Sequence, residues 1–393
     1  MVLLVNLARV VFAPLLEPIR TQFGASATAV GLLASLAWLG SALPRLPTGY
    51  LLTRVPRHAV IFVAGAMLAV SPVLAGTATS LPMLWTSAFV MGLSSGMYFI
   101  AAKPLLSDLF PTRIGGAIGL HGTASQLAAA GAPLFVTVVL FVSGWRLVFF
   151  VVSVAAAVAT VVFVVVARNT DVPTGEDEDR NFLGAARRQW RVILSGIALA
   201  GLAGLVWNGV FNFYVSYLVV AKAIPEGTAR VLLAVVFAAG VPAFTLAGRL
   251  ADRVAYIPLL LSISTAFAGC VLAFTMTSST AQLVAVSIAL GFVIYSLLPV
   301  IDTYVLDSLP DAHRASAYAV FSASFMLLNA LGSVVVGTLL DAGYAYVTIF
   351  RLFGVCALVL VAVLAGVQLT VGFPTGRRSS RSDSDRPGTS YGR

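Results

Sequence analysis

Several ionisable side chains stand inside long apolar runs of the sequence. Arg9, Arg45, Lys103 and Asp302 all have mainly apolar neighbours along the chain. A charge near the centre of a bilayer costs about 2.5–3.5 kcal/mol on insertion scales, and charges retained there commonly bind substrates or carry ions and protons. These residues therefore indicate recognition of charge. The sequence has no HExxH pair, phosphate-binding loop, serine elbow or Cys/His cluster, so we expect no enzyme, no metal site and no cofactor.

Arg9 is the first candidate for holding a charged ligand. It precedes Arg20 by eleven residues, which is about 16 Å at the rise of an α-helix. Arg9 therefore lies near mid-membrane if Arg20 marks the surface, with Asn6 one turn away on the same face. It could anchor an anionic substrate, or it could be a structural arginine paired with a carbonyl group or a helix C-terminus.

Arg45 is a second candidate for the same role. It stands between Pro44 and Pro47 in the next apolar run. The competing interpretation is that its long side chain reaches back to the membrane surface near Gly49. The four candidate charges, three basic and one acidic, sum to +2, which favours an anion over a cation as ligand.

Lys103 and Asp302 form the most informative pair in the sequence. They differ by 199 positions and carry opposite charges, and the same offset relates the two halves of an internal repeat. Each lies five residues before a loop acid, Asp108 or Asp307. We expect a gating or coupling pair; the alternative is that the two charges are solvated independently near the inner surface.

Neutral polar residues supply further candidates. Asn208 and Asn212 share one helical face and could donate hydrogen bonds to a substrate or join two helices. Tyr98 and Tyr295 are candidate substrate ligands in other apolar runs. His121 could take part in proton coupling because its ordinary pKa lies near neutrality, although a structural histidine in a helix contact explains it as well.

The composition requires that these residues lie in a membrane. Of 393 residues, 59% are hydrophobic and only 10% are charged, and the mean hydropathy is +0.98. Spanning helices need about 20 apolar residues each. The sequence divides into twelve such runs, which predict an all-α polytopic membrane protein: 1–17, 27–52, 59–79, 82–106, 114–141, 146–167, 192–219, 229–249, 256–276, 281–305, 315–339 and 345–371.

The basic residues predict how the chain lies in the membrane. With the N-terminus inside, sixteen of them fall on the cytoplasmic side and four fall outside, namely Arg20, Arg146, Lys222 and Arg230. The positive-inside rule therefore favours cytoplasmic termini in the plasma membrane. The net charge of +9 lies in loops between apolar runs, so it does not indicate nucleic acid. The first run begins at Met1 and is short, which implies either a thinned bilayer or missing residues.

An internal repeat appears when the chain is shifted by 199 positions. The segment 49–54 then falls on 248–253, and 108–111 falls on 307–310. Both matches follow an even-numbered run, so the repeat comprises two parallel six-span units. We expect bundles at 1–168 and 192–371, a charged cytoplasmic linker at 169–191 and a disordered cytoplasmic tail at 372–393.

The loop residues carry a resemblance to the major facilitator superfamily. The pattern Gly-x-Leu-x-Asp-Arg-x-Gly-Arg of that family is similar to Gly248, Leu250, Asp252 and Arg253, and more loosely to Gly49, Leu51, Arg54 and Arg57, where Thr53 replaces the acid. The resemblance implies two pseudo-symmetric six-helix bundles that rock about a central site. It also implies gating roles for Asp252 and Arg253, and a cavity lined by the spans that carry Arg9, Lys103 and Asp302.

The resulting functional prediction is a monomeric secondary active transporter. Its substrate is a small organic or inorganic anion, coupled to protons or to a counter-substrate. Arg45 has a context similar to that of the nitrate porter branch, but the eighth run lacks a partner arginine and the fifth lacks Gly-Asn-x-Gly, which disfavours nitrate. The alternatives are proton-coupled drug or cation efflux through Asp302, and a sensor or scaffold that transports nothing.

Overall fold

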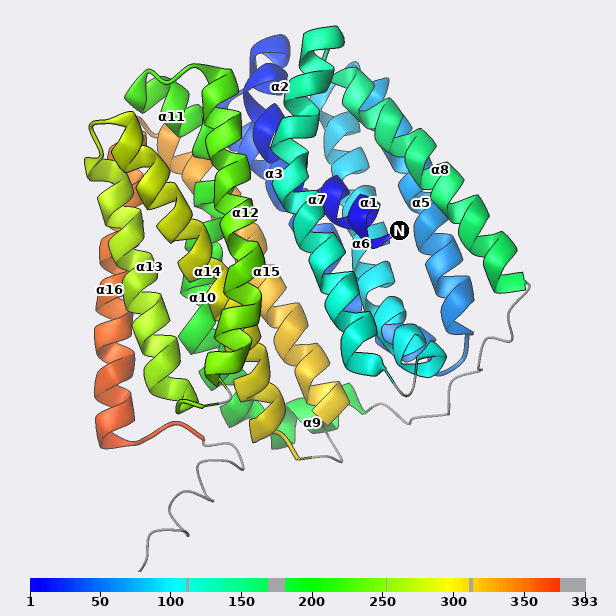
Figure 1. Ribbon diagram of the computed structural model, residues 1–393, viewed down its shortest axis with the longest axis vertical. Helices are drawn as coiled ribbons and strands as arrows, with labels where there is room; N and C mark the ends of the chain where they lie inside the picture. The colour runs from blue at the N-terminus through cyan, green and yellow to red at the C-terminus, as the bar shows by residue number, and fades with distance from the viewer. Residues whose placement is uncertain (111–112, 169–180, 252, 311–313, 375–393) are drawn as a thin grey trace, which may run out of the picture.

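The computed structural model describes residues 1–110, 113–168, 181–251, 253–310 and 314–374, and in these ranges its regular secondary structure is helical (Figure 1). The helices are α1 (Val2–Val10), η1 (Ala13–Leu15), α2 (Leu16–Phe23), α3 (Ala27–Ala42), α4 (Arg45–Leu51), α5 (Arg57–Gly76), α6 (Leu81–Leu109), α7 (Ile114–Val142), α8 (Arg146–Arg168), α9 (Phe182–Arg188), α10 (Trp190–Asn212), α11 (Tyr214–Lys222), α12 (Glu226–Ala251), α13 (Tyr256–Met276), α14 (Thr280–Ser308), α15 (Arg314–Asp341) and α16 (Tyr346–Thr370).

Eleven helices in the described ranges are long and apolar enough to span a membrane, and the bent pair Val2–Val10 and Ala13–Phe23 makes twelve. The predicted all-α fold is thus confirmed. The first span was expected to end near residue 17, but its helix continues to Phe23. The reason is that Pro18 lies in the first turn of α2, where its missing N–H costs no hydrogen bond. Pro14, in η1, lies where the span bends by 41°.

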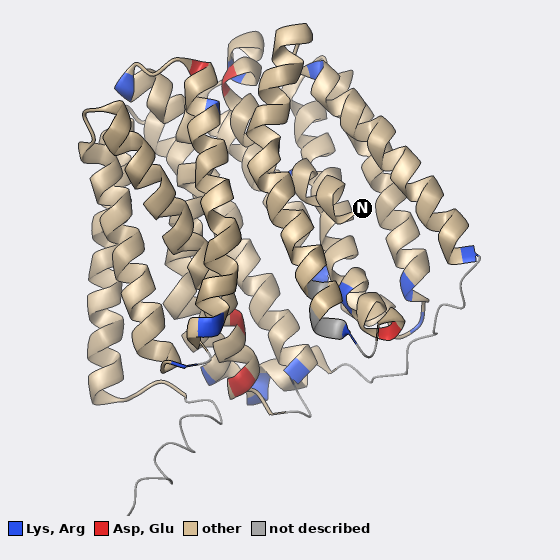
Figure 2. Cartoon of the chain, in the orientation of Figure 1, with Lys and Arg blue, Asp and Glu red and all other residues tan. Residues whose placement is uncertain are grey.

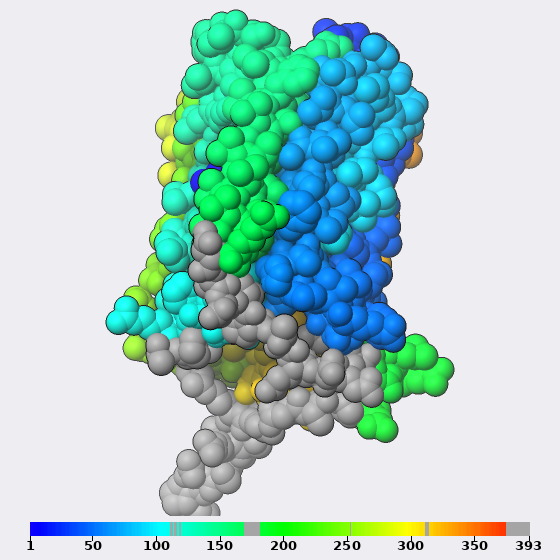
Figure 3. Space-filling view, turned by 90° about the vertical axis from the view of Figure 1, so that its right-hand side faces the viewer, coloured from blue at the N-terminus to red at the C-terminus, as the bar shows by residue number. Residues whose placement is uncertain are grey.

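The outer surface of the bundle is apolar, as contact with lipid requires. Figure 3 shows α5 and α8 side by side on one face of the molecule. Large apolar side chains on this face are more than half exposed, including Val70 on α5 and Val154, Val158 and Val161 on α8. A water-soluble protein would bury such a continuous surface.

The two halves are built from equivalent helix contacts. In the N-terminal half α3 packs on α6 and α5 on α8, and in the C-terminal half α12 packs on α14 and α13 on α16. The halves meet where α3 contacts α15 and where α7 contacts α12. A shift of 199 positions carries α3 onto α12 and α7 onto α15, so each interface is the repeat image of the other.

Glycine sets how closely the helices of one interface approach. A Cβ atom on Gly337 of α15 would collide with the backbone oxygen of Ala27 in α3, and one on Gly31 would lie 2.5 Å from the oxygen of Ser333. Because no real Cβ contact is that short, a larger residue at either position would force α3 and α15 apart.

The two ends of the bundle differ in charge and in how the halves meet. Lys and Arg gather at the lower end in Figure 2; we name it the arginine-rich end and the opposite one the arginine-poor end. The halves lie together at the arginine-poor end and diverge toward the other (Figure 1). Of the predicted linker, the described part contains the helix α9, whose N-terminus is capped by Asn181 Oδ1 accepting from the Gly184 N–H at 2.7 Å.

Candidate functional site

Arg9 lies in the last turn of α1, a helix that Figure 1 shows at mid-height in the bundle. Only 9% of the residue is exposed. Its guanidinium carbon lies 4.9 Å from the ring centre of Trp38 on α3 and 4.8 Å from that of Phe99 on α6. These distances are typical of cation–π contacts. Both rings belong to the N-terminal half, so this half supplies the cation–π contacts.

A short chain of hydrogen bonds orients Arg9. Asn6 Nδ2 donates to the backbone oxygen of Ser125 on α7 at 2.6 Å, and this leaves Asn6 Oδ1 to accept from Arg9 Nη2 at 2.6 Å. Arg9 Nε has no hydrogen-bond partner among the described residues. The guanidinium is therefore held in a defined orientation while part of its donor capacity stays unused.

No carboxylate neutralises Arg9 within the described part of the chain. The ion pairs there join Arg57 to Asp108 and Arg230 to Glu226. Arg45 is instead close enough to Arg9 to repel it electrostatically. A buried cation beside another cation, without an acid in contact, creates a site of positive potential.

Arg45 begins α4 and connects the two halves. Its Nε donates to the backbone oxygen of Ser41 at 3.3 Å, and its Nη1 donates to Ser322 Oγ on α15 of the C-terminal half. The side chain is half-buried. Arg45 thus points between the halves rather than only toward the membrane surface.

The C-terminal half contributes aromatic rings to the same region. Tyr295 on α14 lies within electrostatic range of Arg9. Its ring centre is 5.9 Å from Trp207 on α10, 6.2 Å from Phe237 and 6.2 Å from Phe244 on α12. We name Arg9, Arg45, Trp38, Phe99 and Tyr295 the central arginine site.

Among the described residues, Lys103 and Asp302 do not form an ion pair in this conformation. Lys103 is exposed on α6. The Asp302 carboxylate on α14 lies close enough to Tyr318 of α15, to Lys103 and to Arg45 to interact with each of them electrostatically. The two residues lie where the halves diverge, so a gating role in a differently closed state stays a prediction.

Asn208 and Asn212 lie in a contact between α10 and α15. Each is 1% exposed. Asn212 Nδ2 donates to the Asn208 backbone oxygen and to Ser333 Oγ, both at 2.9 Å, and the Asn208 side-chain amide nitrogen donates to Ser333 Oγ at 2.8 Å. These bonds join α10 to α15, and a substrate-binding role for either asparagine stays a prediction.

Tyr98 and His121 pack behind Phe99. Their rings are stacked with centres 5.8 Å apart, and His121 meets Phe99 edge-on at 5.9 Å. Tyr98 is 6% exposed, and His121 Nε2 is buried without a hydrogen-bond partner among the described residues. These two side chains support the ring that covers Arg9, and they do not touch Arg9 in any described contact.

The described residues include only part of the loop motif that resembles the family pattern. Asp252 lies outside the described residues, and Arg253 is exposed. In the N-terminal half Arg57 forms an ion pair with Asp108, which joins the start of α5 to the end of α6. The predicted gating roles of Asp252 and Arg253 stay predictions.

Sequence reasoning missed Trp38, Ser322 and Tyr318. The internal repeat could have identified Trp38, because the 199-position offset carries it onto Phe237, which packs on the candidate residue Tyr295. Nothing in the sequence distinguishes Ser322 or Tyr318 from other residues of their helix. A serine or tyrosine in a spanning helix becomes a candidate only when its partner across the interface is known.

These features define a class of membrane protein: two repeats of six spanning helices that enclose charged residues between them, as in secondary transporters. The chain belongs to the Major Facilitator Superfamily, whose family model matches residues 1–253 and 198–388. Members of this superfamily bind small-molecule substrates. Among proteins with curated descriptions, no match to the sequence was found.

Solved structures with the same fold support this assignment. A bacterial homologue of the human lysosomal transporter Spinster, in an inward-facing and occupied conformation, aligns with a TM-score of 0.76 at 18% identity over 94% of each chain. The D323A mutant of the nucleoside transporter NupG aligns with a TM-score of 0.77 at 13% identity, over 93% of this chain and 98% of that one.

Proposed function

We propose that the protein is a secondary active transporter of a small organic anion, which it moves across the plasma membrane by alternating access of the central arginine site. One observation carries the proposal: Arg9 is a buried, oriented cation with no carboxylate in contact among the described residues. Arg45 adds a second charge of the same sign.

The energetics favour an anionic ligand. A charge in mid-membrane is unfavourable unless other groups stabilise it. The two aromatic rings and Asn6 stabilise the charge of Arg9 in part. An incoming carboxylate would supply the missing opposite charge. Because a guanidinium is planar, it can also bind both carboxylate oxygens at once.

The aromatic rings favour an organic anion over an inorganic one. Trp38 and Phe99 both pack against the Arg9 guanidinium, so a ligand at this cation would meet aromatic surface beside the charge. Tyr295 and Trp207 then offer apolar surface to the body of the ligand.

The arrangement of the halves supports alternating access. They are bonded together at the arginine-poor end and diverge toward the arginine-rich end. If the positive-inside rule orients this protein as predicted, the conformation is open toward the cytoplasm. The Spinster homologue, which has the same fold, is also described as inward-facing.

Cation efflux is the second candidate, and Asp302 is the observation that favours it. Its carboxylate could accept a proton or bind a cation. However, Lys103 and Arg45 both lie within electrostatic range of the same carboxylate, so the region keeps a positive excess. The anion is therefore the better supported substrate.

Transport by the full chain in liposomes tests the proposal. A panel of radiolabelled organic carboxylates and organic cations is offered with and without a pH gradient. We expect uptake of one or more carboxylates, lost in Arg9→Gln and retained in the control Arg146→Gln. Uptake of organic cations that no carboxylate inhibits would overturn the proposal and favour efflux through Asp302.

A further inference from the structure

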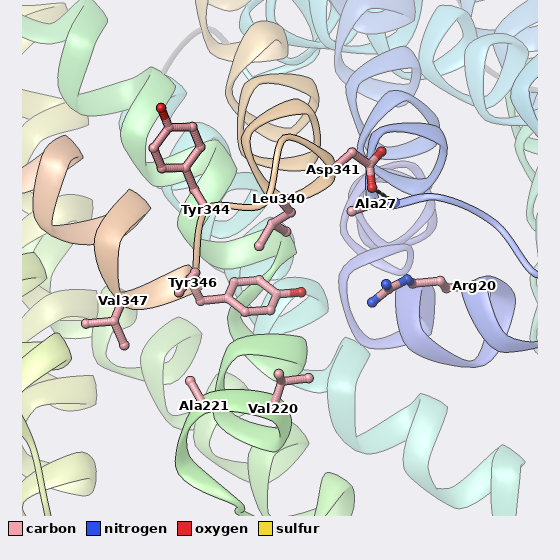
Figure 4. Close-up of a pocket in the computed structure, with 10 residues that line it drawn as sticks. Arg20, Ala27, Val220, Ala221, Leu340, Asp341, Tyr344, Tyr346 and Val347 are labelled. Atoms are coloured by element: carbon pink, nitrogen blue, oxygen red, sulfur yellow. Dashed lines mark hydrogen bonds between the residues drawn. The ribbon is translucent and has the colours of Figure 1, made fainter.

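A cavity of about 390 Å³ lies at the arginine-poor end, between the halves (Figure 4). It belongs to neither the central arginine site nor its approach from the arginine-rich end. Its walls come from α2, α3, α11, α15 and the start of α16, and they include Arg20, Ala27, Val220, Leu340, Asp341 and Tyr346.

Arg20 supplies a positive charge to the wall of this cavity. Figure 4 shows its guanidinium directed toward the Tyr346 hydroxyl across the cavity, and the two groups interact electrostatically. No described residue forms an ion pair with Arg20. Glu17, one turn away on α2, instead accepts from Ser216 Oγ at 3.1 Å.

The acid in the cavity wall is already satisfied. Asp341 Oδ1 accepts from the Ala27 N–H at 3.0 Å, and its Oδ2 accepts from the Thr28 N–H at 2.8 Å. Asp341, the last residue of α15, thereby neutralises the positive N-terminal end of α3. Both carboxylate oxygens of Asp341 are thus bonded in this contact between the halves. Within the described ranges, Asp341 does not form an ion pair with Arg20, so the charge of Arg20 remains available to a ligand.

The rest of the wall is apolar. Val220, Leu340 and the ring of Tyr346 line the cavity around Arg20. A volume of about 390 Å³ falls within the usual range of small-molecule sites, which combine apolar walls with a few polar groups. The matching ligand has one carboxylate for Arg20 and a compact apolar or aromatic body.

We propose that this cavity binds an organic carboxylate and thereby holds the protein in the conformation that is closed at the arginine-poor end. The walls come from both halves, so the cavity exists only while α3 and α15 are in contact. A ligand that binds one conformation alone shifts the population toward it. The state-holding role rests on the alternating access of the proposed function, whereas binding at Arg20 does not.

Binding is tested with 2-naphthoate on the purified full chain, with neutral 2-naphthamide as the matched control ligand. The experiments use Arg9→Gln protein, so that the central arginine site cannot account for binding. We expect calorimetric binding of naphthoate that weakens about 10- to 150-fold in Arg9→Gln/Arg20→Gln, the effect of losing a hydrogen bond to a charged group. Arg9→Gln/Arg146→Gln, which removes a different arginine at the same end, should bind like Arg9→Gln.

Equal binding of naphthamide, or naphthoate binding that Arg20→Gln leaves intact, would overturn the site. If Arg20→Gln protein does not fold, Arg20→Lys keeps the charge and should retain part of the affinity. The proposed function has a separate test. It fails if Arg9→Gln transports like the parent, whatever the result of the binding experiments at Arg20.

The state-holding role needs its own measurement. Ser35 Oγ accepts from the Val334 N–H at 3.0 Å inside the contact of α3 with α15, so a cysteine there is reachable only when this end opens. In a background without Cys270 and Cys356, naphthoate should slow the labelling of Ser35→Cys by a membrane-impermeant thiol reagent. An unchanged labelling rate at saturating naphthoate would show that the cavity does not hold the conformation.

Discussion

Replacing Arg9 by glutamine should separate substrate recognition from stability. In a protein whose buried arginine is paired with an acid, removing the arginine costs about 3–5 kcal/mol, because the acid is left buried and unpaired. Arg9 has no such acid among the described residues. We therefore expect Arg9→Gln to lose the substrate while it keeps its thermal stability.

The magnitudes follow from the contacts of Arg9. Removing the charge recovers a cost of about 2.5–3.5 kcal/mol for a cation in mid-membrane. It gives up contacts with Trp38 and Phe99, worth about 0.5–2 kcal/mol each, while glutamine can still donate to Asn6. The recovered cost and the lost contacts nearly cancel in the free energy of unfolding. Loss of a buried charge pair with the ligand costs about 2–5 kcal/mol, or about 30- to 4,000-fold in affinity.

The assay combines a melting curve of purified protein with transport in liposomes. Arg146→Gln is the matched control: Arg146 also donates one hydrogen bond, to the Ala78 oxygen at 2.9 Å, and lies 4.5 Å from the ring centre of Trp145. It sits at the arginine-poor end, away from the central arginine site. The control should therefore melt and transport much like the parent.

Two results would refute the reasoning. A large fall in melting temperature for Arg9→Gln, with a parental substrate affinity in the protein that remains folded, would make Arg9 a structural residue. Equal loss of transport in Arg146→Gln would show that the effect does not depend on the central arginine site. Arg9→Lys adds a graded test, because lysine keeps the charge but not the planar pair of donors, so its affinity should fall between those of parent and Arg9→Gln.

Three further predictions concern conformational change. Lys103→Asp and Asp302→Lys should each impair transport, while the double swap recovers part of the loss in a double-mutant cycle; purely additive effects would contradict a gate. Asp252→Asn should lower the turnover rate at nearly unchanged substrate affinity, because a loop contact acts on a conformational step, and parental turnover would remove Asp252 from the mechanism. Gly337→Leu should open the arginine-poor end, because its side chain would meet the Ala27 oxygen; labelling of that interface from outside should rise, and an unchanged rate would contradict the close packing seen here.

The sequence alone determined the architecture. Twelve apolar runs and a repeat at 199 positions are properties of the chain read in order, so they predicted the spans and the two halves without knowledge of any contact. Arg9 could be placed near mid-membrane for the same reason, since helical rise converts sequence distance into depth. The end of the first span was predicted too early, because Pro18 lies in the first turn of α2, where a proline does not end a helix.

The tertiary structure decided what surrounds each candidate. Trp38 and Phe99 cover Arg9 from two other helices, and Arg45 reaches Ser322, 277 residues away in the sequence. Asn212, a candidate ligand by type and spacing, bonds to Ser333 across a helix contact. Hydropathy fixes how deep a residue lies in the membrane, but the rotation and packing of each helix fix which neighbour it faces, and those depend on side chains far away along the chain.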